Sequence, residues 1–288
     1  MDPLNRKALI SILVVLIIGA LLAWAGSQGG QFVYGIPLFA LLVGMAFIIQ
    51  WIVFIPAFIF QSEKFFDLTG SLTYILVIIT GLVLSNSQDS RSILLLAMVV
   101  IWAVRLGGFL FLRIHRAGKD DRFDEWKPSF FRYLNVWNLQ GLWVSFTMAS
   151  ATIAISSSNS RELDIFALIG GVVWLIGLVI EATADGQKRR FKSDPANDGK
   201  FIQSGLWSRS RHPNYFGEII LWVGVAIVVI PVLQGWQWIA LISPVFVTLL
   251  LTRVSGIPIL EDKAEKSWGG QADYEKYKKS TPTLIPKI

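Results

Sequence analysis

The segment from Ala8 to Ala25 reads ALISILVVLIIGALLAWA and contains no charged residue. As an α-helix it would be about 27 Å long, close to the ~30 Å hydrocarbon thickness of a bilayer. Arg6 and Lys7 precede the run, as basic residues precede the apolar part of a signal peptide. The run is long for such a peptide, and further apolar runs follow it. We therefore expect a retained first transmembrane helix.

Seven further apolar runs repeat this pattern along the chain. The sequence is 53% hydrophobic and only 16% charged, whereas soluble domains carry about 25% charged residues. The charges gather between the apolar runs, which is typical of repeated membrane crossings. The pattern predicts an all-α polytopic membrane bundle of about eight helices, the other seven lying near residues 36–59, 71–86, 92–113, 135–156, 164–183, 217–233 and 237–253.

The distribution of basic residues predicts the orientation. With the N-terminus on the cytoplasmic side, 23 of the 26 lysines and arginines fall in cytoplasmic segments. Only Arg91 and Arg161 lie in outer loops, and Arg105 lies within a helix. This bias predicts cytoplasmic N- and C-termini. We expect one integral membrane domain over 1–288, with polar chemistry in the larger cytoplasmic segments, 114–134, 184–216 and 254–288.

Composition also argues against several classes of function. The chain has no cysteine, which excludes disulfides and thiolate chemistry. It has two histidines and no HExxH pattern, so we expect no zinc site or other metal site. The net charge of +6 would suit a nucleic-acid partner, but basic cytoplasmic loops account for it. We therefore expect a lipid bilayer, and no nucleic acid, around this protein.

The stretch from Gly205 to Glu218, GLWSRSRHPNYFGE, is the most specific in the chain. Pro213 suits the first turn of a helix, which places Arg211 and His212 just before the seventh apolar run. Further polar residues, Asn214, Tyr215 and Glu218, then follow on the first turns, where a helix N-terminus favours anions. A polar cap on a membrane helix explains one or two of these residues but not all of them together.

The sixth helix is expected to continue beyond the membrane. Glu181, Asp185 and Arg189 recur every four residues and so share one face. This face is either a solvated helix end or one wall of a cofactor pocket. A nucleotide would need several basic side chains around its phosphates. The chain offers Arg113, Arg116, Lys119, Arg189, Lys192 and Arg211.

The C-terminal segment predicts a cytoplasmic helix that packs on the bundle. It contains acidic and basic residues in near-equal number, as a solvated tail would. However, Trp268, Tyr274 and Tyr277 recur within it, and such large aromatic side chains favour docking over solvation.

Several motifs resemble one superfamily. RHPNYFGE at 211–218, RLGGFLFLR at 105–113, EKFFDLTGSLTY at 63–74 and the ending from Asp273 to Pro286 are similar to the steroid 5α-reductase C-terminal-like membrane proteins, specifically the large bacterial branch described as DUF1295. The resemblance extends through most of the chain. It implies NADPH bound in a polar cytoplasmic cavity, mainly by residues 135–288, and reduction of a carbon–carbon double bond conjugated to a ketone.

The resemblance also implies roles for individual residues. Asn214, Glu218 and Trp222 match the reductase motif N-x-x-G-E-x-x-x-W residue for residue. Together with the motif and the basic cluster described above, the resemblance gives these candidate cofactor-binding residues: Arg113, Arg116, Asp185, Arg189, Lys192, Lys200, Arg211, His212, Asn214, Tyr215, Glu218 and Trp222. The reductases also use an early Glu and Tyr at the substrate carbonyl, which no motif here matches. Tyr74 as acid, with Glu63 or Asp67 to orient it, is the hypothesis for that role.

Two other classes of function stay open. Isoprenylcysteine and phospholipid methyltransferases share an Arg-His-Pro-x-Tyr motif, which Arg211 to Tyr215 fits, and they would bind S-adenosylmethionine. That cofactor has no phosphate, so the basic cluster favours NADPH. A non-catalytic lipid-binding protein is the second alternative. An apolar small-molecule substrate would arrive from the bilayer, and a bacterial plasma membrane is the expected location.

Overall fold

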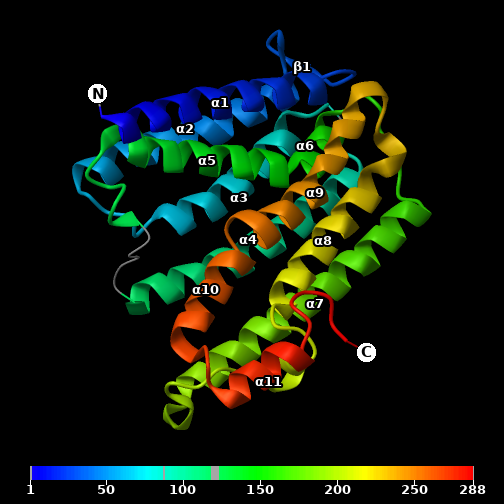
Figure 1. The fold of residues 1–288 in the computed structure, drawn as a ribbon. Coiled ribbons are helices and arrows are strands. Elements are labelled where there is room, and N and C mark those ends of the chain that lie inside the picture. Colours follow the sequence, from blue (N-terminus) through cyan, green and yellow to red (C-terminus); the bar gives the residue numbers. More distant parts are fainter. Residues whose placement is uncertain (1, 87, 118–122, 288) are drawn as a thin grey trace. The chain divides into compact units, whose positions relative to one another are not determined.

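Helices make up nearly all the regular structure in the computed structural model, which describes residues 2–86, 88–117 and 123–287 (Figure 1). The side chains of 109–117 are not part of the description. The chain forms two compact units, each considered by itself. Unit 1 comprises residues 1–166 and 228–243, and unit 2 comprises residues 167–227 and 244–288.

Unit 1 is a bundle of apolar helices. Its elements are α1 (Pro3–Gly26), α2 (Leu38–Ile59), α3 (Phe66–Leu84), α4 (Ser90–Ala117), α5 (Phe130–Thr147), α6 (Ala149–Ser156) and the 3₁₀ helix η5 (Gly235–Leu241). α5 packs against both α1 and α2, and α3 packs against α4. The start of α1 follows from its sequence, because the Asp2 carboxylate caps the amides of Leu4 and Asn5 and Pro3 occupies the first turn.

The fifth predicted helix differs from a single straight span. The run 135–156 is a pair of helices, α5 and α6, bent by 61° at Met148. The break frees the carbonyl of Thr147, and the Ser243 hydroxyl donates a hydrogen bond to it. The Ser150 hydroxyl likewise donates to the carbonyl of Ala240, 2.7 Å away. Ser243 therefore satisfies a backbone carbonyl where the helix is interrupted, and Ser150 links the start of α6 to η5.

Arg91 connects three separate backbone segments of unit 1. Its side chain is 2% exposed and donates to the carbonyls of Arg161, Glu162 and Val228. It also pairs with Asp164 at 2.9 Å. Burial of an arginine requires this many partners, since an unpaired buried charge is costly.

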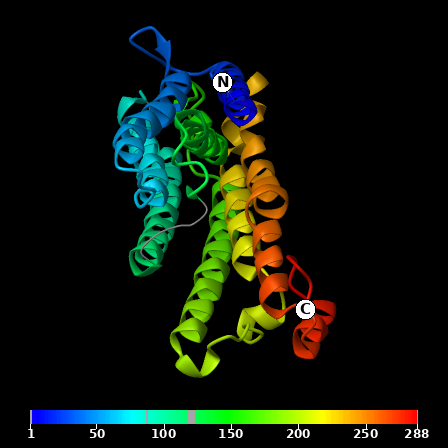
Figure 2. The ribbon, with the colours of Figure 1, turned by 60° about the vertical axis from the view of Figure 1, so that its left-hand side comes forward.

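Unit 2 contains α7 (Ile165–Ser193), α8 (Pro213–Val229), α9 (Ile242–Leu249), α10 (Ile257–Trp268) and α11 (Ala272–Ser280), with a π-helical turn at Leu250–Val254. The bounds of α7, α8 and α9 each extend two residues across the limits of the unit. Figure 2 shows α7 and α8 running side by side. Glycines make this contact close: a Cβ added at Gly177 would lie 2.4 Å from the backbone nitrogen of Leu221, and one at Gly224 would lie 2.5 Å from that of Trp174. Small residues let membrane helices approach in this way.

The helices confirm a multi-pass membrane protein. Among the described residues, seven helices are long and apolar enough to cross a bilayer, or eight if the bent pair α5–α6 forms one span. The predicted continuation of the sixth helix is also confirmed, because α7 ends at Ser193. The orientation of the termini and the single-domain organisation stay predictions.

Candidate functional site

A cavity of about 220 Å³ opens within unit 2. The end of α7, the 200–212 segment, α10 and α11 form its walls. Cationic side chains predominate among the polar groups, and Glu261 is the only carboxylate among the described lining residues. The remaining wall is aromatic and apolar. The charged and aromatic lining residues are Lys188, Lys192, Lys200, Arg211, Lys263, Glu261, His212, Phe191, Phe201, Trp207, Trp268, Tyr274 and Tyr277.

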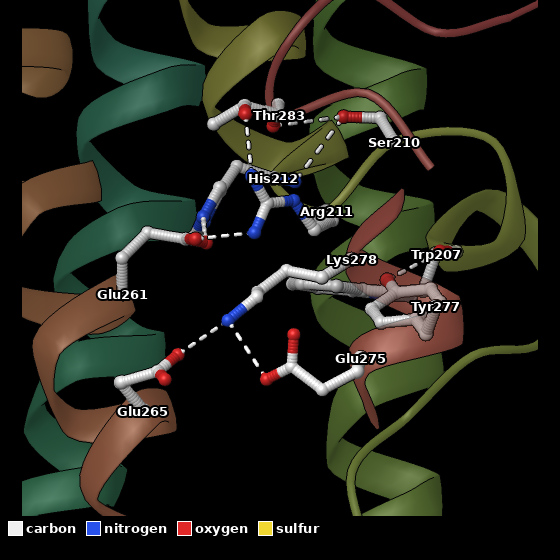
Figure 3. Close-up of polar contacts among 10 residues, drawn as sticks. All are labelled: Trp207, Ser210, Arg211, His212, Glu261, Glu265, Glu275, Tyr277, Lys278 and Thr283. Atoms are coloured by element: carbon white, nitrogen blue, oxygen red, sulfur yellow. Dashed lines mark hydrogen bonds and ion pairs between the residues drawn. The ribbon is translucent and has the colours of Figure 1, made fainter. Parts of the chain in front are cut away.

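Glu261 holds two residues of the Arg-His-Pro-Asn motif (Figure 3). One carboxylate oxygen lies 2.7 Å from Nε2 of His212, and the other accepts from the guanidinium of Arg211. A second guanidinium nitrogen of Arg211 donates to the Thr283 hydroxyl at 2.6 Å. The motif therefore presents a fixed arginine and a fixed imidazole to the cavity.

The surroundings of His212 favour the neutral form of its imidazole. Burial lowers the pKa of His212, Glu261 opposes that shift, and the positive charges of Lys188 and Arg211 add to it. A neutral ring that donates from Nε2 to Glu261 leaves Nδ1 as an acceptor. None of the described residues forms a hydrogen bond with this buried nitrogen, with Nε of Arg211 or with Oδ1 of Asn214. These three atoms suit a polar ligand.

The last residues of the chain, 282–287, form hydrogen bonds with the backbone and side chains at the start of the motif. The amide of Arg211 donates to the carbonyl of Pro282 at 2.9 Å, and the Ser210 hydroxyl donates to that of Leu284 at 2.7 Å. The amide of Lys287 donates in turn to the carbonyl of Arg209 at 2.9 Å. These bonds fix the position of the 209–211 backbone, from which Arg211 reaches the cavity.

The aromatic wall confirms the predicted docking of the C-terminal segment. The ring of Phe201 lies 5.7 Å from Trp268, 5.2 Å from Tyr274 and 5.4 Å from Tyr277. The Tyr277 hydroxyl donates to the carbonyl of Trp207 at 2.6 Å, and burial raises the pKa of that phenol. The indole of Trp207 in turn lies 4.5 Å below the ammonium group of Lys188, a cation–π contact.

The structure gathers only part of the predicted cofactor set at this cavity. Lys192, Lys200, Arg211 and His212 line it. The lining residues within the described chain do not include Asp185 or Arg189 on α7, nor the α8 residues Asn214, Tyr215, Glu218 and Trp222. The rings of Tyr215 and His212 stack at 5.7 Å, and Trp222 is buried. The side chains of Arg113 and Arg116 lie outside the described ones.

Sequence reasoning left several lining residues out of the predicted site. Lys188, Trp207, Glu261 and Lys263 all face the cavity. Two signals were visible in the sequence: the acidic start of the C-terminal segment and a tryptophan two residues before Arg209. Their contacts could not be found, since Glu261 meets His212 across 49 residues of chain.

The proposed catalytic residues belong to unit 1. Glu63 precedes α3, is 4% exposed and pairs with Lys127 at 2.6 Å. Asp67 and Tyr74 lie two turns apart on α3 and so share a face. The Tyr74 ring packs edge-on against Trp102, with centroids 5.0 Å apart. Glu63 is thus paired with Lys127, and Tyr74 stays the proposed acid.

These features define a multi-pass membrane protein with a basic, aromatic-lined cavity. The chain belongs to the family described as "Protein of unknown function (DUF1295)", whose model matches residues 53–281. This confirms the family suspected from the sequence motifs. No solved structure matches the chain significantly.

Curated relatives match shorter segments. One is 3-oxo-5-alpha-steroid 4-dehydrogenase 1 of Rattus norvegicus, 30% identical over 42% of this chain and 41% of the relative. Another is Delta(14)-sterol reductase of Arabidopsis thaliana, 32% identical over 28% of this chain and 24% of the relative. A third is "Probable O-methyltransferase ustE" of Ustilaginoidea virens, 34% identical over 28% and 29%. The chain thus spans less than half the length of each.

Proposed function

We propose that this protein is a membrane-embedded, NADPH-dependent reductase of a conjugated carbon–carbon double bond in a steroid-like or other lipid substrate. The observation that carries the proposal is the cavity of unit 2, where five cationic side chains meet an aromatic wall. Two relatives are named as a steroid dehydrogenase and a sterol reductase, which supports the same class. The resemblance to a bacterial branch supports a bacterial plasma membrane as the location.

The residues of the cavity fit such a cofactor. NADPH carries three phosphate groups and two planar ring systems. Lys192, Lys200, Lys263 and Arg211 would hold the phosphates through charge-assisted hydrogen bonds. The aromatic rings would pack against the planar groups. The unpartnered Nδ1 of His212 would accept a hydrogen bond from an amide or amine group.

Tyr74 is the residue proposed to handle the proton. When bound, the cofactor supplies a hydride to the β-carbon of the substrate. The Tyr74 hydroxyl would donate to the carbonyl oxygen, where negative charge develops. The edge-on contact with Trp102 fixes the orientation of the Tyr74 ring for this task.

The change Tyr74→Phe is expected to lower turnover of an authentic enone substrate by about a hundredfold or more, the usual contribution of a positioned general acid. Nucleotide binding should be unchanged, because Tyr74 is not among the described residues that line the cavity. Single-turnover oxidation of NADPH, followed by absorbance, measures the effect. Turnover equal to that of the unchanged protein would remove Tyr74 from the mechanism.

Cofactor discrimination tests the proposal as a whole. Detergent-purified protein is expected to melt at a higher temperature with NADPH than with NADH or S-adenosylmethionine. A ligand at about 100 times its Kd contributes about 2.7 kcal/mol if it binds only the folded state. The change Lys263→Ala, at the cavity, should weaken stabilisation by NADPH. The matched change Lys266→Ala should not, because Lys266 lies on the same helix, pairs with Asp262 and does not line the cavity.

An S-adenosylmethionine-dependent methyltransferase of the isoprenylcysteine or phospholipid type is the second candidate function. The relative named as a probable O-methyltransferase favours it. So does Glu261, which already neutralises Arg211 and leaves fewer cations for phosphates. A melting temperature raised by S-adenosylmethionine alone would support the methyltransferase and contradict the reductase proposal. Stabilisation by NADPH without turnover of any lipid enone would favour a non-catalytic lipid-binding protein.

A further inference from the structure

A small hairpin projects at the end of unit 1 that follows α1 (Figure 1). Strand β1 (Phe32–Val33) pairs with β2 (Ile36–Pro37), and Tyr34 and Gly35 form the two-residue turn. Both turn residues have positive φ angles, 51° and 79°. Such a turn favours Asn-Gly, because asparagine and glycine tolerate the left-handed conformation. Here a tyrosine occupies the asparagine position and is 98% exposed.

Tyr34 is exposed although the hairpin that carries it is held in place by hydrogen bonds at its base. The amide of Gln31 donates to the carbonyl of Ser156 at 2.7 Å, and its side chain donates to that of Ser157 at 2.8 Å. The amide of Leu38 donates back to the carbonyl of Gln31 at 2.8 Å. The base of the hairpin is therefore fixed, and the strained turn holds the tyrosine ring outward.

The hairpin follows a helix with an exposed apolar surface. On α1 the exposed apolar residues Leu13, Ile17, Leu21 and Trp24 follow each other at helical spacing and form one stripe. Trp24 ends this stripe, in the last turn of α1. Its ring lies 6.1 Å from that of Trp236, which is exposed at the start of η5.

Tryptophan and tyrosine gather at the level of lipid headgroups, because their rings are apolar and carry one polar group. The exposed residues here have that composition. We name them the aromatic rim: Trp24, Phe32, Tyr34, Ile36, Trp236 and Trp238. The sequence around them carries no Asp, Glu, Lys or Arg from 8 to 62 and from 219 to 252. A neutral rim of this kind has no attraction for anionic lipids in particular.

We propose that the aromatic rim is a membrane anchor, in which the hairpin tip lies in the headgroup layer of the leaflet opposite the N-terminus and the Tyr34 phenol contacts phospholipid headgroups. The occupant of this surface is lipid, since the rim is continuous with the lipid-facing stripe of α1. Its depth is set by aromatic partitioning, so it does not depend on the charge of the lipid.

The absence of cysteine makes the test direct. A nitroxide attached at Tyr34→Cys, in the full chain in phosphatidylcholine nanodiscs, is expected to have a higher ratio of collisions with lipid-soluble oxygen to collisions with a water-soluble nickel complex than a label in water. The control Glu162→Cys, on an exposed charged loop of the same unit, should have the low ratio of a label in water. Adding phosphatidylglycerol should leave both ratios unchanged. A ratio at position 34 no higher than that of the control would overturn the proposal, as would strong dipolar broadening from a second copy.

A second variant separates anchoring from folding. Tyr34→Asn places a residue suited to the positive φ, so the protein in detergent should melt at the same or a higher temperature. A nitroxide at Phe32→Cys should then become less accessible to oxygen in the Tyr34→Asn background than with Tyr34 present. Equal accessibility in the two backgrounds would show that the phenol ring does not hold the hairpin in the headgroup layer.

Discussion

Replacement of Gly177 with alanine is expected to cause the largest loss of stability among the changes considered. The added Cβ would lie 2.4 Å from the nitrogen of Leu221 and 2.6 Å from the carbonyl oxygen of Gly217. Both are backbone atoms of α8 and cannot rotate away, so α7 and α8 must separate. Overpacking of this kind costs about 1–3 kcal/mol, and more when nothing can yield. Thermal unfolding in detergent measures the loss.

Gly171 provides the matched control for this change. It lies on the same helix, and a Cβ there would meet nothing within 4 Å. Gly171→Ala should therefore gain up to about 1 kcal/mol of helix propensity. The two variants share chemistry and helix, so opposite shifts isolate the interhelical contact. Equal melting temperatures would mean that α7 and α8 do not depend on this approach.

The glycine contact also bears on the cavity. α7 ends in the basic residues that line the cavity, and Gly217 lies one turn after Pro213, at the start of α8. A shift between the two helices would therefore move Lys192 relative to Arg211. We expect Gly177→Ala to weaken NADPH binding as well as stability, whereas Gly171→Ala should leave binding unchanged.

Hydropathy and basic-residue counts were sufficient to predict the membrane spans, because both depend on composition over about 20 residues. They did not predict the bend at Met148, since a broken membrane helix needs partners for its freed backbone. The partner of the Thr147 carbonyl is the hydroxyl of Ser243, which lies 96 residues later in the chain. Composition at 135–156 gives no sign of it.

The candidate site, too, depends on long-range contacts that the local sequence does not reveal. Pro213 and the polar residues around it mark a helix start, which local rules predict. The wall opposite comes from α10 and α11, and its contacts with the motif are long-range. The sequence predicted that Trp268, Tyr274 and Tyr277 dock, because aromatic side chains are rarely left in solvent. It gave no basis for choosing Glu261 as the partner of Arg211 and His212, because several acidic residues lie in the same segment.

Glu261→Ala is expected to destabilise unit 2 by about 2 kcal/mol. The carboxylate pairs with the side chains of Arg211 and His212, which are 14% and 6% exposed. Removal of one partner of a buried ion pair costs about 3–5 kcal/mol, and partial exposure of Glu261 reduces that figure through screening. Glu265→Ala is the control. It removes the same side chain one turn later, from an exposed pair with Lys278, and should change little.

The pH dependence of unfolding gives this prediction a second readout. The pKa of His212 is lowered in the folded protein, so below the unfolded value of about 6.5 the unfolded chain binds more protons. Stability is therefore lost as the pH falls through that value toward the folded pKa. Glu261 raises the pKa of His212, so its removal should lower that pKa further and steepen the loss between pH 7 and 5. Glu265→Ala should follow the unchanged protein throughout. A Glu261→Ala curve parallel to the control would contradict the pairing of Glu261 with His212.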